Sequence, residues 1–83
     1  MDSEAVRIRE LVIEAGALVD WLETGRGDLE IVGAALIYLR DELCALSEET
    51  GDPEACSAGC GMVETIDAML AAGSVERRTH RAA

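Results

Sequence analysis

The chain has 83 residues and a formal net charge of −10 at pH 7, from 17 acidic and 7 basic residues. Its length allows one domain at most, and its apolar content of 49% is too high for a disordered chain. Because so acidic a surface repels phosphate groups, we expect no direct binding to nucleic acid or to an anionic membrane surface. Ala and Leu dominate the apolar residues and Phe is absent, which favours helices over strands.

The sequence also indicates in which cellular compartment the protein is expected. The first four residues, Met-Asp-Ser-Glu, lack the basic and then apolar layout of a signal peptide, and no apolar run approaches the roughly 20 residues that span a bilayer. The odd number of cysteines, 3, argues against a closed set of disulfides. We therefore expect a cytoplasmic protein with no membrane partner. Every basic residue is Arg and none is Lys, which is typical of GC-rich bacterial coding sequences.

The first predicted helix covers residues 4–23, with Ser3 or Asp2 as its N-cap. The Thr-Gly-Arg-Gly segment at 24–27 ends this helix, and Gly25 suits a left-handed backbone conformation. Apolar residues that alternate in spacing between three and four form one stripe along the helix, as in antiparallel bundles and short coiled coils. The stripe consists of Ile8, Leu11, Ala15, Leu18 and Leu22.

The second predicted helix covers residues 28–49, with Asp28 as its N-cap and Gly51 as the residue that stops it. It has the most regular stripe of the chain, so we expect it to be the central helix. The stripe consists of Leu29, Val32, Leu36, Leu39, Leu43 and Leu46.

The third predicted helix covers residues 53–72, and Gly73 is its expected stop. Asp52 at the N-cap followed by Pro53 at the first helical position is the most specific local signal in the chain. Its stripe consists of Ala55, Gly59, Met62, Ile66, Met69 and Gly73, in which the small residues allow another helix to come close.

These elements predict an all-α fold: a small antiparallel three-helix bundle, formed by a helical hairpin and a third helix. Because the connections are short, consecutive helices should run antiparallel. We expect residues 1–73 to form the single domain and residues 74–83 to form a flexible basic tail. A chain this small has little core of its own, so we also expect a homodimer.

The first two helices each have a second apolar set. In the first helix, Val6, Ile13, Ala17 and Trp21 lie nearly opposite the stripe. In the second helix, Ile31, Tyr38 and Ala45 form a line at seven-residue spacing. A helix that is apolar on two faces needs two neighbours. Either the third helix covers these residues, or they form an intermolecular surface, where aromatic side chains are enriched.

The cysteines are the main candidates for chemistry. Cys56 and Cys60 lie four residues apart on one helix, and Cys44 belongs to the preceding helix. A structural zinc site needs four ligands, commonly from paired CxxC motifs, whereas this spacing is CxxxC and the single histidine, His80, belongs to the tail. We therefore expect no metal and no cofactor, and interpret the cysteines as small apolar residues that fill helix contacts. A metal or redox role is the alternative.

Catalysis has little support in the sequence. A nucleophilic triad would have to recruit His80, and a phosphate-binding loop would need a Lys that the chain lacks. We therefore expect a protein that is not an enzyme.

The leading hypothesis is a small non-enzymatic protein-binding module that acts as a regulator, adaptor or inhibitor through an apolar helix face. The expected binding residues are Ile13, Ala17, Trp21 and Tyr38, with Glu10, Glu14 and Asp20 as their acidic surround. We expect the partner to be a protein, and a basic surface on that protein would complement the negative charge of this chain. The alternative is an acidic mimic of nucleic acid that occupies the groove of a basic nucleic-acid-binding protein, such as a phage-encoded anti-defence protein.

Overall fold

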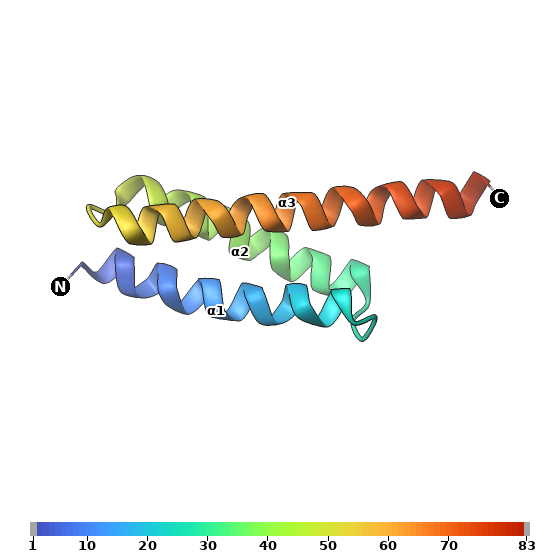
Figure 1. Ribbon diagram of the computed structural model, residues 1–83, viewed down its shortest axis with the longest axis horizontal. Coiled ribbons are helices and arrows are strands. Elements are labelled where there is room, and N and C mark those ends of the chain that lie inside the picture. The colour runs from blue at the N-terminus through green and yellow to red at the C-terminus, as the bar shows by residue number, and fades with distance from the viewer. Residues whose placement is uncertain (1, 83) are drawn as a thin grey trace.

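The protein is a bundle of three α-helices that all pack against one another. A computed structural model describes the backbone of residues 2–82 and the side chains of residues 2–72. The helices are α1 (Ser3–Glu23), α2 (Leu29–Glu49) and α3 (Pro53–Ala82), and consecutive helices run antiparallel (Figure 1). Residues 2–82 contain no strand, so the predicted all-α three-helix fold is confirmed.

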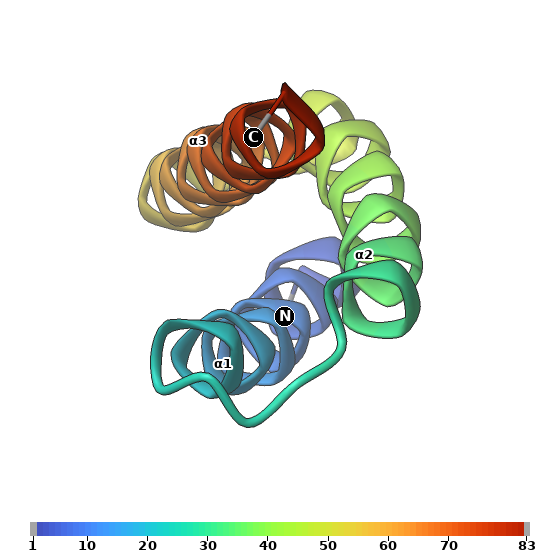
Figure 2. The same ribbon diagram turned by 90° about the vertical axis from the view of Figure 1, so that its right-hand side faces the viewer.

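Each helix turns one side to the other two. Viewed from the end, the helices stand at the corners of a triangle, and the opposite side of each helix points outward (Figure 2). The predicted stripes supply the inner sides. The core consists of Ala5, Ile8, Leu11, Ala15, Val19, Val32, Leu36, Leu39, Leu43, Ala55 and Ile66.

The stripe of α1 drifts near its C-terminal end. Val19 is buried there, whereas the stripe residues Leu18 and Leu22 are only partly buried. A straight α-helix turns 100° per residue, so it drifts by about 20° per heptad relative to a strict 3.5-residue repeat. The side of α1 that faces the core therefore shifts away from the predicted stripe residues toward the C-terminal end of the helix.

The helix ends follow the predicted capping residues. Asp2, rather than Ser3, caps α1, and its carboxylate accepts hydrogen bonds from the backbone N–H groups of Glu4 and Ala5. Asp28 caps α2 in the same way. Gly25 has φ of +72°, a left-handed conformation that favours glycine in the turn after α1.

The third helix is longer than predicted. It continues through Gly73 to Ala82 and extends past the α1–α2 loop (Figure 1). Glycine within a helix costs about 1 kcal/mol relative to alanine, which weakens a helix without ending it. The side chains of residues 73–83 lie outside the described part of the chain, so the flexible basic tail stays a prediction.

A close approach between helices occurs at Gly59, as the small residues of the third stripe predict. Gly59 is buried, and a Cβ atom built on it would overlap the Ser47 hydroxyl of α2 and lie 3.4 Å from Cγ2 of Ile8 in α1. The absence of a side chain at Gly59 thus brings all three helices together.

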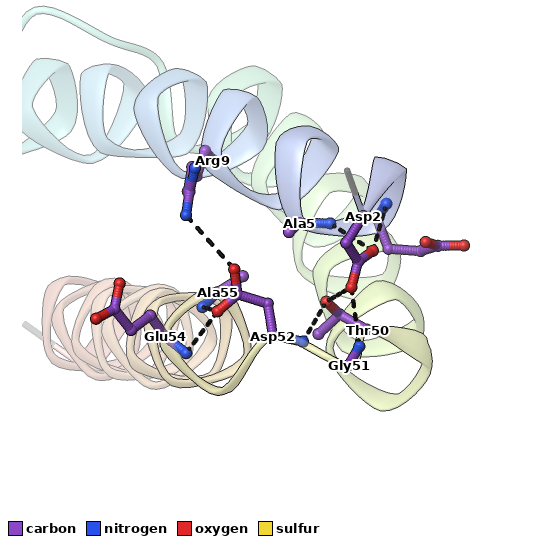
Figure 3. Close-up of polar contacts among 9 residues, drawn as sticks. Asp2, Ala5, Arg9, Thr50, Gly51, Asp52, Glu54 and Ala55 are labelled. Atoms are coloured by element: carbon purple, nitrogen blue, oxygen red, sulfur yellow. Dashed lines mark hydrogen bonds and ion pairs between the residues drawn. The ribbon is translucent and has the colours of Figure 1, made fainter.

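One carboxylate links the start of α1 to the α2–α3 loop (Figure 3). While one oxygen of Asp2 caps α1, the other accepts hydrogen bonds from Thr50 Oγ1 at 2.8 Å and from the Gly51 N–H at 2.9 Å. The hydrogen bond from Thr50 is the largest of several that hold the pKa of Asp2 well below its ordinary value of 3.8. Asp52 caps α3 beside this link, and Arg9 lies 3.5 Å from it.

The low pKa of Asp2 predicts a specific response to acid. A carboxyl with a depressed folded-state pKa stabilises the protein fully above its ordinary pKa, and this stabilisation is lost as the pH falls below that value. An Asp2→Asn variant should therefore lose less stability than the wild type between pH 6 and about pH 2, because its cap does not titrate. Urea unfolding monitored by circular dichroism across this range measures the difference.

The matched control is Asp20→Asn, which alters an exposed carboxylate on α1. This variant should keep the acid response of the wild type. If Asp2→Asn and the wild type lose stability in parallel, Asp2 does not provide the acid-sensitive link.

Candidate protein-binding surface

The apolar residues opposite the core stripe of α1 are exposed. The exposed fraction is 75% for Ile13, 48% for Trp21 and 36% for Val6, and Ala17 is also exposed. Both neighbouring helices pack against the inner side of α1, and the outer side of this helix faces away from them (Figure 2). The described part of the third helix, up to residue 72, therefore does not cover the predicted binding residues of α1.

The line of apolar residues on α2 is exposed as well. The exposed fraction is 73% for Ile31 and 69% for Tyr38. Trp21 lies near the end of α1 and Ile31 near the start of α2, so both flank the loop that joins these helices. We refer to Ile13, Ala17, Trp21, Ile31 and Tyr38 as the outer surface.

Local hydrogen bonds hold the backbone beneath Trp21. Its carbonyl oxygen accepts hydrogen bonds from Thr24 Oγ1 and from the Arg26 N–H, each at 3.0 Å. A pocket of about 380 Å³ lies at the same end of the bundle, with Leu22, Leu29 and Met69 in its lining. The end of the bundle that carries the α1–α2 loop thus combines large exposed apolar side chains with a pocket.

The acidic residues of α1 that were predicted to surround the binding site are accessible to solvent. Glu10, Glu14 and Asp20 are all exposed. Arg7 lies 3.4 Å from Glu10 and also 3.6 Å from Glu42 of α2, so one arginine engages two carboxylates.

Another arginine joins α2 to α3 through acidic partners. Arg40 donates to Asp67 of α3 at 3.0 Å and to the adjacent Asp41 at 3.1 Å. These hydrogen bonds, the one to Asp67 first, raise the pKa of Arg40. Since Arg7, Arg9 and Arg40 all pair with carboxylates, little positive charge is left to offset the acidic residues of the described side chains.

Two features of the surface were not predicted from the sequence. Ile31 was not among the predicted binding residues, although it precedes Tyr38 by seven positions and is the more exposed of the two. The second missed feature is a groove between α2 and α3 with a volume of about 350 Å³.

All three cysteines line this groove. It is bordered by Cys44 and Glu48 of α2 and by Cys56, Cys60, Val63 and Glu64 of α3, and we call it the thiol groove. The three thiols are free; Cys44 and Cys60 are exposed and Cys56 is partly buried. The interpretation of the cysteines as small apolar residues that fill helix contacts is therefore wrong for Cys44 and Cys60, whose side chains are exposed.

The environment of Cys56 differs from that of an isolated thiol. Burial raises its pKa, and the neighbouring Cys60 thiol adds to the increase through charge and hydrogen bonding. The hydroxyl of Ser47, which also lines the groove, is buried without a hydrogen-bond partner. Among the described residues, no three His, Cys, Asp or Glu side chains are arranged to hold one metal ion together.

None of the described helices combines the length and the apolar character that crossing a membrane requires. No protein-family model, no curated protein and no solved structure matches the chain.

Proposed function

We propose that the protein is a non-enzymatic protein-binding module whose outer surface docks a partner protein. The exposure of this surface is the observation that supports the proposal. Ile13, Trp21 and Tyr38 remain at least 48% exposed although all three helices already pack against one another. Burial of such side chains in a partner pocket is the usual source of binding energy at protein interfaces.

Charge favours a partner with a basic rim. Glu10, Glu14 and Asp20 surround the apolar residues of α1, and the chain carries a net charge of −10. Basic side chains around an apolar patch on the partner would steer the encounter and fix the orientation of docking. A second copy of this chain would instead bring acidic residues against acidic residues. The homodimer expected from the sequence stays a prediction, which the mass in solution tests.

Replacement of Trp21 with Ala should weaken binding of the partner by about 2 kcal/mol or more, which is roughly 30-fold in the dissociation constant. The wild-type protein, immobilised at low salt, is first used to isolate the partner from a cell extract. The dissociation constant of the purified partner is then measured for the wild type and for Trp21→Ala.

The control for this measurement is Ile37→Ala. Ile37 is also an exposed apolar residue of α2, at 44%, but it adjoins Tyr38 in sequence and therefore points to a different side of the helix. Ile37→Ala should bind as the wild type does. Equal affinities for Trp21→Ala and the wild type would contradict the proposed docking surface.

Salt distinguishes the second candidate function, the acidic mimic of nucleic acid. The excess of acidic over basic residues, which gives the chain a net charge of −10, favours this candidate. Binding by an acidic mimic should collapse between low and moderate ionic strength and should be insensitive to Trp21→Ala. Binding through the outer surface should persist at moderate ionic strength and be weakened by that substitution.

A further inference from the structure

The thiol groove brings residues from two helices to one place, independently of the outer surface. Cys56 and Cys60 both face it from α3, and Cys44 faces it from α2. Its walls are mainly apolar, and two carboxylates, Glu48 and Glu64, lie at its border. Three free thiols that line one groove are a potential binding site for a thiophilic ligand.

The spacing of Cys56 and Cys60 decides which chemistry is available. Side chains four residues apart on a helix have Cβ atoms about 5–6 Å apart, whereas a disulfide needs Cβ atoms roughly 3.5–4.5 Å apart. The helix is continuous across both residues, so a disulfide between them would have to distort it. A metal–thiolate bond is about 2.3 Å long in zinc sites, so one ion of similar size between two sulfur atoms holds them roughly 4.6 Å apart. The spacing of Cys56 and Cys60 accommodates this separation.

We propose that Cys56 and Cys60 bind a single soft cation with two-coordinate geometry, of which Cu(I) is the representative. Each thiol releases its proton to solvent as its sulfur atom bonds to the ion. Thiolates are the ligands that select Cu(I). Zn(II) is a poor fit because it requires a tetrahedral set of four ligands, and no three suitable side chains converge among the described residues.

The third cysteine provides an internal control. Cys44 lines the same groove, but it comes from α2 and is not paired with a second cysteine on its own helix. It is therefore not a ligand in this proposal. The identity of the ligands can be tested without reference to the partner protein, so failure here would leave the proposed docking function unaffected.

The experiment is a competition for Cu(I) between the reduced full-length chain and a chromophoric Cu(I) chelator under anaerobic conditions. The wild type and Cys44→Ser should each withdraw a single Cu(I) ion per chain from the chelator. Cys56→Ser and Cys60→Ser should lose this capacity. Circular dichroism checks that each variant keeps its helices, and Cys60→Ser alters an exposed side chain, so it provides the test even if Cys56→Ser unfolds.

Three results would overturn the proposal. The first is a wild-type chain that cannot compete with the chelator. The second is undiminished Cu(I) binding by Cys60→Ser. The third is equal loss by Cys44→Ser, which would show that the ion bridges α2 and α3 rather than binding to the cysteine pair of α3.

Discussion

Replacement of Ile8 with Ala is expected to lower the free energy of unfolding by about 2–5 kcal/mol. Ile8 is fully buried on α1, and its Cγ2 atom faces Gly59 of α3. Truncation removes apolar contacts and leaves a cavity, because the surrounding helices cannot move in far enough to fill it. A domain of this size has a stability on the order of 5–10 kcal/mol, so the variant should approach the limit of folding.

Ile13→Ala is the matched control for this substitution. It makes the same chemical change on the same helix, but Ile13 is 75% exposed. Its effect on the free energy of unfolding should stay within about 0.5 kcal/mol. Urea unfolding monitored by circular dichroism compares the two variants. Similar losses of stability would show that the inner and outer sides of α1 are assigned wrongly.

Replacement of Gly59 with Leu is expected to destabilise the protein by about 1–3 kcal/mol or more. Even a Cβ atom at this position would overlap the Ser47 hydroxyl, and it would lie 3.4 Å from Ile8. A leucine would force α3 away from both neighbours, because a close-packed interior has no room for the added methyl groups. The measurement is again urea unfolding.

The control for Gly59 lies two residues further along α3. A Cβ atom on Gly61 would meet nothing within 4 Å, so Gly61→Leu keeps the packing intact. It should stabilise the helix by about 0.5–1 kcal/mol, because it removes a glycine from the helix interior. If both leucine variants shift stability in the same direction, the close approach at Gly59 is not what requires glycine there.

Local signals in the sequence predicted the helices well. Asp28 and the Asp52-Pro53 pair mark helix starts because their geometry satisfies the free N–H groups of the first turn. The regular leucine spacing of α2 predicted the side that is buried, as Leu36 and Leu43 show. Both kinds of signal depend on a few neighbouring residues, so they can be interpreted without knowledge of the fold.

Features that depend on packing between helices were harder to predict. The periodicity showed that Ile13 and Trp21 lie opposite the stripe, but only their exposed fractions show that no described side chain of the bundle covers them. The groove that gathers Cys44 with Cys56 depends on the alignment of α2 against α3. Gly73 was expected to end α3, but the helix continues through it. A glycine can occupy a position within a helix at some cost in stability as well as end one.

The most direct test of the docking surface uses the fluorescence of Trp21, the single tryptophan of the chain. Because Trp21 is 48% exposed, acrylamide should quench its emission efficiently in the free protein. When a saturating amount of a tryptophan-free or 4-fluorotryptophan-labelled partner is added, docking should shield Trp21, lower its quenching constant and shift its emission to the blue. An unchanged quenching constant in a complex shown to have formed would contradict the proposed docking surface.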